Sequence, residues 1–353
     1  MLDFDQQLDE KIDGACDFIR ESLEESPSYV EIDSEEEEKE PLVLDKDLKQ
    51  FSFKEICESK SKAQIAAVDG GSATIVKGRS FVIGVYRAGY LIFQNGKRVK
   101  TKVSRLSLET VSLGNLKEKY YAAYSKLIGE EPTEAPGLDK ILDRLRLFEE
   151  WRLILKLLDE LNSDDILLID GSLRASIVPP YNFLSYVTSK AKKKNIHLVG
   201  ITKTSTLYWG KKSPLIPMVV KKSEELFGKG KWYCRLSDLD WALKNSNWFG
   251  IIYVAKLKKA SDYAFRVDVN REDDVSPDAI FSVLSDLASS PQALGYPYPL
   301  AAIHNQVRIA SSEIEDLRYQ LQQKALQKGI STVDWDLLFS DFHEVLDLDL
   351  KGK

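Results

Sequence analysis

The chain has 353 residues, 43% hydrophobic and 29% charged, a composition typical of a soluble globular protein with a large core. No apolar run approaches the about 20 residues of a membrane span, and the acidic first residues do not resemble a signal peptide. Three scattered cysteines and three histidines argue against a disulfide framework and a histidine-rich zinc site. We therefore expect a cytoplasmic protein without membrane attachment.

The net charge of −6 hides an uneven distribution. Residues 1–60 hold 20 acidic and 7 basic residues, which leaves residues 61–353 with a net charge of +7. Residues 77–126 and residues 190–231 each carry 11 Lys or Arg against 2 acidic residues. Such clusters are typical of a surface that follows a polyanion such as DNA, although solvated lysine-rich faces are a common alternative.

The first 60 residues predict an acidic helical extension and linker. Apolar residues recur at spacings of three and four across residues 3–25, which predicts an amphipathic helix. The acidic run at residues 31–40 is most often a solvated spacer, although it could contact a basic partner. We expect a main domain at residues 61–330 and a C-terminal docking tail at residues 331–353.

Two apolar strands are predicted to end in Asp-Gly, at Ile65–Asp69 and at Ile166–Asp170. Open α/β sheets hold their ligands at the carboxyl ends of such strands. Two neighbouring buried carboxylates are costly unless a cation compensates them, and carboxylates suit magnesium or manganese. The alternative is that each Asp only caps a turn.

An antiparallel meander is predicted from strands at residues 81–87, 89–93 and 97–103. The dipeptide Asn95-Gly96 is a strong signal for a type I′ hairpin before the last strand. Candidate DNA contacts near this hairpin are Lys97, Arg98 and Lys100.

A long helix is predicted from Leu138 to Leu161, with two adjacent glutamates inside it. Glu150 lies one turn from apolar neighbours on the buried stripe, which makes it a candidate metal ligand. Glu149 is slightly better placed to stay in water, and it remains an alternative ligand. A solvent-exposed Glu150 in a salt bridge is an equally open reading.

The second half of the chain adds helices and strands that carry three more candidates. A helix at residues 182–194 precedes a strand at residues 197–201, and Lys203 follows this strand, where it could meet a phosphate or be a surface lysine. Further elements are predicted as strands at 250–256 and 263–269, a helix at 277–289, and a helix from Pro299 to about Gln327. This last helix carries His304, with Tyr296 eight residues upstream.

These motifs, in this order, resemble the NurA nuclease family over about residues 61–310. The elements that carry the resemblance are Val68-Asp69-Gly70, Glu150-Trp151-Arg152-Leu153, Leu168-Ile169-Asp170-Gly171-Ser172-Leu173, Lys203, and Gly295-Tyr296-Pro297-Tyr298-Pro299-Leu300 with His304. The resemblance implies an α/β fold with an RNase H-like core, a mixed central sheet and flanking helices, extended by helices at both termini. It also implies a homodimer that works with a hexameric HerA-type translocase on single- and double-stranded DNA ends.

By motif position, the resemblance assigns metal ligation to Asp69, Glu150 and Asp170, with Tyr296 and His304 in other active-site roles. Gly71 stands where the family more usually has Ser. Cleavage of a phosphodiester needs an activated water and charge stabilisation, which one or two Mn²⁺ or Mg²⁺ ions can supply. His304 could orient or deprotonate the water, or bind the ion, and Tyr296 could contact a phosphate or a base; both could instead be packing residues.

The sequence therefore predicts a manganese-dependent DNA exonuclease, with possible endonuclease activity, that resects DNA ends in recombinational repair. One alternative is an actin-like, ATP-binding phosphotransferase, because residues 69–74 also resemble a phosphate loop; we find no late Gly-Gly turn for an adenosine pocket. Another alternative is a non-catalytic DNA-binding assembly partner, in which the acidic residues are structural.

Overall fold

The computed structural model describes residues 30–31, 41–42, 52–58, 62–78, 80–205, 207–209, 213–237, 247–327, 330–333 and 335. The helix expected at residues 3–25 and most of the tail expected at residues 331–353 lie outside these residues. Among the described helices, none combines the length and the apolar character that crossing a bilayer would require.

The chain divides into two compact units. The first unit contains residues 1–63, 168–175 and 188–298; the second contains residues 64–167, 176–187 and 299–353. Three elements, β8 (Ile166–Asp170), α4 (Tyr181–Lys193) and α8 (Tyr298–Val307), begin in one unit and end in the other.

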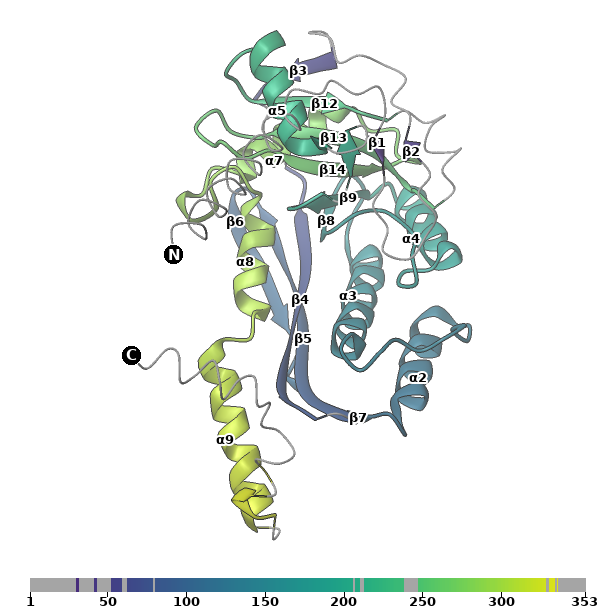
Figure 1. Ribbon diagram of the computed structural model, residues 1–353. Helices are drawn as coiled ribbons and strands as arrows, with labels where there is room; N and C mark the ends of the chain where they lie inside the picture. The colour runs from purple at the N-terminus through teal and green to yellow at the C-terminus, as the bar shows by residue number, and fades with distance from the viewer. Residues whose placement is uncertain are drawn as a thin grey trace, which may run out of the picture. The chain divides into compact units, whose positions relative to one another are not determined.

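The fold is the expected RNase H-like α/β core with a mixed sheet and flanking helices. In the first unit the strand order is β3 (Phe53–Glu55), β12 (Trp232–Arg235), β13 (Gly250–Lys256), β14 (Phe265–Asn270), β9 (His197–Thr202) and β8. In the second unit it is β8, β4 (Ile65–Lys77), β5 (Phe81–Gln94) and β6 (Lys97–Val103), with β7 (Ser107–Ser112) also on β5. Figure 1 labels these strands. Short two-residue pairs are formed by β1 (Val30–Glu31) with β2 (Pro41–Leu42) and by β10 (Tyr208–Trp209) with β11 (Ser213–Pro214).

Helices cover the sheet within each unit. In the second unit, α3 (Ile141–Glu160) packs against β4 and β5, and α2 (Leu116–Ile128) packs against α3 (Figure 1). In the first unit, α5 (Leu215–Leu226) contributes Leu215, Met218 and Val219 to a core with Trp232 and Trp248. Helix α7 (Pro277–Leu287), also in this unit, places Phe281 against Tyr233 in a stacked arrangement with ring centroids 4.3 Å apart. The predicted helices at 138–161, 182–194 and 277–289 are therefore confirmed, with small differences at their ends.

Strand β4 corrects one expectation, because it does not end at Asp69. It continues to Lys77, and Asp69, Gly70 and Gly71 pair with Gly89, Ala88 and Arg87 of β5. Residues 69–74 are therefore strand and not a phosphate loop. The glycines serve close packing: a Cβ atom on Gly70 would lie 2.5 Å from Oε1 of Glu150, and one on Gly71 would lie 2.3 Å from the carbonyl oxygen of Val307. Successive residues of a strand face opposite sides, so α3 approaches β4 from one side and α8 from the other.

Strand β5 is one continuous strand and not the expected pair at residues 81–87 and 89–93. The ladder to β4 runs without interruption through Ala88 and Gly89, which explains the continuity. The predicted hairpin is confirmed: Asn95 and Gly96 have φ values of 52° and 71°, the positive values that a type I′ turn requires.

The helix expected from Pro299 to Gln327 is broken. It forms α8, which ends at Val307, and α9 (Ser311–Gln327). Arg87 stabilises the break, because its Nε donates to the carbonyl oxygen of Val307 at 3.0 Å and its Nη2 donates to that of Arg308 at 2.6 Å. These bonds satisfy carbonyl groups that a helix end leaves without a helical partner. Helix α9 then packs Ile314, Leu317, Leu321 and Ala325 against the β4–β5 core.

Candidate active site

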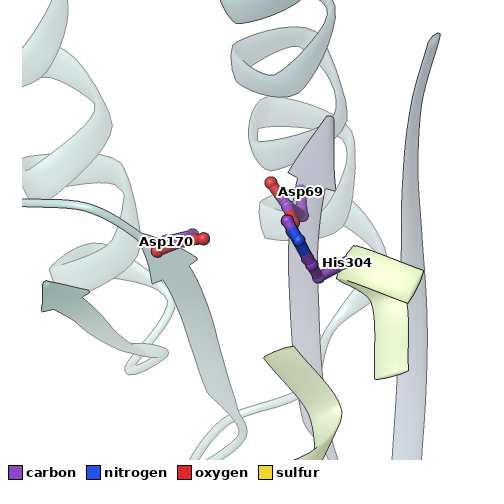
Figure 2. Close-up of side chains that lie close together, drawn as sticks. All are labelled: Asp69, Asp170 and His304. Atoms are coloured by element: carbon purple, nitrogen blue, oxygen red, sulfur yellow. The ribbon is translucent and has the colours of Figure 1, made fainter. Parts of the chain in front are cut away.

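In the second unit, the buried carboxylate of Asp69 faces the imidazole ring of His304. Nδ1 of His304 lies 2.8 Å from Oδ2 of Asp69, and Figure 2 shows the ring directed at this carboxylate. The backbone N–H of Gly70 donates to Oδ1 of Asp69 at 2.7 Å. His304 and the Gly70 amide thus contact different oxygens of the Asp69 carboxylate. The side chain of Asp69 is 7% exposed and that of His304 is 47% exposed, so the histidine forms the open side of the pair.

Glu150 lies on the opposite side of β4, against the backbone of Gly70. Its side chain is 10% exposed and forms an ion pair with Arg146, four residues earlier on α3. The sequence offered Glu150 as a metal ligand, but among the described residues the group that could hold an ion contains Asp69, Asp170 and His304 and not Glu150. The adjacent Glu149 points elsewhere, because it pairs with Arg152 and is one-third exposed.

Arg146 lies beside Glu150, close to Asp69, and it was not among the candidates predicted from the sequence. Burial alone lowers its pKa, but the carboxylates of Glu150, Asp143 and Asp69 act against burial and raise the pKa overall. The guanidinium group therefore stays positive and compensates part of the acidic charge around Gly70. The signal that could have identified Arg146 is its spacing of four from Glu150 on a predicted helix.

In the first unit, Asp170 at the end of β8 pairs with Lys203, whose Nζ lies 2.6 Å from Oδ2 of Asp170. Lys203 also lies over the ring of Tyr296, at 5.5 Å from its centroid. The Tyr296 ring is buried and packs edge-on against Phe265. Lys203 is thus held by an acid and an aromatic ring, and that ring, of Tyr296, is itself packed against Phe265.

The turn after β8 is set by a glycine. Gly171 has a φ of 135°, a conformation that favours glycine, and its N–H donates to the carbonyl oxygen of Ile201 at 2.9 Å. This bond ties the end of β8 to β9, the strand that leads to Lys203. Asp170 and Lys203 are therefore brought together by adjacent backbone segments.

Two of the candidate basic residues of the hairpin are exposed, and the third forms an ion pair. Lys97 and Arg98 are exposed on β6. Nζ of Lys100 lies 2.8 Å from Glu160 and 5.4 Å from the centroid of the Tyr90 ring. The three candidate DNA contacts are therefore not equivalent.

Asp69 and Asp170 with His304 offer oxygen and imidazole ligand atoms that could hold a metal ion. Carboxylate oxygens suit Mg²⁺ and Mn²⁺, and an added imidazole suits a transition metal such as Mn²⁺ better than Mg²⁺. The residues present therefore fit the divalent ion that the sequence predicts.

The family model described as the NurA domain matches residues 63–309. The comparison with curated proteins gives no match. Among solved structures, the chain is similar to the NurA nuclease from Sulfolobus solfataricus, with a TM-score of 0.49 and 16% identity over 78% of this chain and 88% of that one. It is also similar to a second NurA crystal structure, with a TM-score of 0.47 and 10% identity over 77% of this chain and 91% of that one.

A more distant similarity links the chain to the catalytic domain of human endonuclease V, with a TM-score of 0.37 and 12% identity over 74% of this chain and 84% of that one. Family membership rests on the domain match, which contains every site residue discussed above. Because this match spans residues 63–309, well over half of the chain, the protein belongs to the NurA family of nucleases.

Proposed function

We propose that the chain is a manganese-dependent deoxyribonuclease, with Asp69, Asp170 and His304 around the metal. Glu150 lies on the other side of β4, beside Gly70, and is not proposed as a ligand of this ion. The observation that carries this proposal is the buried Asp69 carboxylate held at hydrogen-bond distance from His304. A buried acid of this kind is costly without positive charge nearby, and a bound cation supplies it.

The course of β8 supports a shared site for the two aspartates (Figure 2 draws them with His304). The N–H of Ile166 donates to the carbonyl oxygen of Gln64 at 2.9 Å, so β8 starts beside the start of β4. Asp170 lies four residues beyond Ile166, and Asp69 lies five residues beyond Gln64. Similar lengths of extended chain therefore lead to the two carboxylates.

When bound, the ion would lower the pKa of a water ligand and stabilise charge on the phosphate. The residues of the chain would supply the remaining functions. In the tautomer with its proton on Nδ1, His304 would donate to Asp69, and its Nε2 could then accept a proton from the attacking water instead of binding the ion. Lys203 would give a point charge to a phosphate oxygen, with Tyr296 supporting its position.

We further propose DNA ends as the substrate, a homodimer as the active form and a HerA-type hexameric translocase as the partner, in DNA end resection. The motif resemblance supports the homodimer and the translocase. The exposed cations of β6 support the DNA substrate, because clustered Lys and Arg follow phosphate backbones.

The test is cleavage of end-labelled single- and double-stranded oligonucleotides with Mn²⁺, with Mg²⁺ and with a chelator. We expect cleavage with Mn²⁺, none with the chelator, and at least a hundredfold loss in Asp69→Asn and in Asp170→Asn. The matched control is Asp273→Asn, an acid that pairs with His197 in a buried position and is not among the candidate ligands. Retention of more than about a tenth of the rate, a loss below about 1.4 kcal/mol, would exclude the metal model. DNA binding without cleavage would favour the non-catalytic assembly partner.

A further inference from the structure

We propose that the buried ion pair of Arg266 and Asp268 on β14 positions both segments that carry Asp170 and Lys203. This inference rests on the proposed function, because it treats Asp170 as a metal ligand and Lys203 as a phosphate contact. It adds two positioning residues that the motif resemblance did not include.

Asp268 holds the segment that follows Asp170. Its side chain is fully buried, and its Oδ2 accepts the backbone N–H of Leu173 at 3.0 Å. Leu173 lies three residues beyond Asp170 in the turn that Gly171 begins. A Cβ atom on Gly250 would lie 2.7 Å from the Cβ atom of Asp268, so the neighbouring strand leaves the aspartate little room to move.

Arg266 holds the segment that carries Lys203. Its Nη2 donates to Oγ1 of Thr202 at 2.9 Å, and its Nη1 donates to Oγ of Ser205 at 3.2 Å. These two hydroxyl groups lie on either side of Lys203 in the sequence. The guanidinium group also lies 5.4 Å from the ring centroid of Trp248, which packs over it.

The side chains of Arg266 and Asp268 are joined by an ion pair. Nε of Arg266 lies 3.1 Å from Oδ1 of Asp268, and the side chains are only 4% and 0% exposed. Burial raises the pKa of Asp268, and Arg266 and the Leu173 amide oppose this rise because they stabilise the ionised form. The pair therefore links the turn after β8 to the turn after β9 through one charged network.

Stability alone is a weak reason for such a pair. Replacing a buried ion pair with apolar residues of similar volume is often neutral or stabilising, because removing two charges from water is costly. The hydrogen bonds of this pair to Leu173, Thr202 and Ser205 instead end on the two segments that carry the candidate site residues. Positioning of site residues by buried partners typically contributes 10- to 100-fold to metal affinity or activity.

One variant tests the contact to the segment after Asp170, and a second variant tests the contacts to the segment that carries Lys203. In Asp268→Asn, one oxygen acceptor is replaced by an amide donor, so either the Leu173 or the Arg266 hydrogen bond is lost. We expect its dissociation constant for Mn²⁺, measured by calorimetry, to rise about 10- to 100-fold. In the double variant Thr202→Val, Ser205→Ala, the ion pair stays intact. We expect its Mn²⁺ affinity to stay within about twofold and its kcat to fall about tenfold as Lys203 loses its fixed position.

The matched control is Asp273→Asn, which weakens a different buried pair of the same unit, with His197. We expect this control to melt at a lower temperature while the folded protein keeps the wild-type Mn²⁺ affinity and kcat. A merely structural role predicts that all three variants lower stability and leave both quantities unchanged. That result would overturn the inference.

If Asp268→Asn does not fold, the Thr202, Ser205 double variant tests the inference. This variant should fold, because both hydroxyl side chains are only partly buried. An unchanged kcat in this variant would then contradict the inference. If the wild type binds no Mn²⁺, the proposed function fails, and hydrogen exchange tests the inference separately. Slow exchange of the Leu173 amide in the wild type that becomes fast in the Asp268 variant supports it; fast exchange in the wild type contradicts it.

Discussion

His304 and Asp69 lie 2.8 Å apart through Nδ1 and Oδ2 although 235 positions of sequence separate them. Because the aspartate fixes one ring nitrogen, we predict that His304→Gln lowers the rate of DNA cleavage by about 10²- to 10⁴-fold at saturating Mn²⁺. The fold should persist, because His304 is about half exposed. Single-turnover rates on a labelled oligonucleotide, with circular dichroism for the fold, provide the measurement.

The control for this prediction is His197→Gln. His197 also contacts an aspartate at 2.8 Å, but it is buried in the first unit and takes no part in the proposed chemistry. We expect this variant to lose thermal stability and to keep the cleavage rate of its folded fraction. Equal rate losses in both variants would show that the histidine effect is structural.

The glycines of β4 give a prediction about stability. In Gly71→Ala the new methyl group would lie 2.3 Å from the carbonyl oxygen of Val307, a backbone atom that cannot rotate away. We expect a loss of about 1–3 kcal/mol in the free energy of unfolding, the usual cost of overpacking. Urea denaturation measures this loss. The control is Gly114→Ala, because a Cβ atom there would meet only Oγ of Ser112, at 3.7 Å. Equal losses in the two variants would contradict the close approach of α8.

The basic hairpin predicts a salt dependence of DNA binding. If Lys97 and Arg98 contact phosphates, changing both to Glu should reduce the slope of log affinity against log salt by about 0.7–0.9 per lost contact. Lys100→Glu should in addition lower the stability of the protein, because it also removes an ion pair with Glu160. Fluorescence anisotropy at several salt concentrations gives the slopes. Lys259→Glu changes an exposed lysine of the first unit and is the control. An unchanged slope in the hairpin variant would remove β6 from the DNA-binding surface.

The two described cysteines should differ in reactivity. Burial raises the pKa of Cys234 to about 12, whereas Cys57 is exposed. Because the thiolate is the reactive form, a thiol reagent at about pH 8 should label Cys57 quickly and Cys234 only as fast as the protein unfolds. The measurement uses a Cys16→Ser background so that these two thiols alone remain. Rapid labelling of both in the native protein would show that the core around Cys234 opens readily.

Much of the fold could be predicted because its signals are local. The type I′ hairpin at Asn95-Gly96, the apolar run that forms β8 and the helical period of α3 each depend on neighbouring residues. The sequence predicted a phosphate contact or a surface position for Lys203, and its ion pair with Asp170 was not predicted.

The errors share a physical cause, which is packing between residues distant in sequence. Gly70 and Gly71 indicated a turn, yet they form strand because two helices approach their backbone closely. The break after α8 depends on Arg87, more than 200 residues earlier, and no local pattern predicts it. The pair of Arg266 and Asp268 was missed for the same reason, since its role depends on the partners that the fold supplies. Arg146 differs, because its spacing of four from Glu150 is a local signal.

The contact between Gly71 and Val307 also sets a limit on divergence among related sequences. A larger residue at position 71 would be tolerated only where the chain near position 307 has moved away, and such a shift would carry His304 with it, because His304 is one turn earlier on α8. Residue 71 and the end of α8 should therefore change together during evolution, while Gly114 should vary independently.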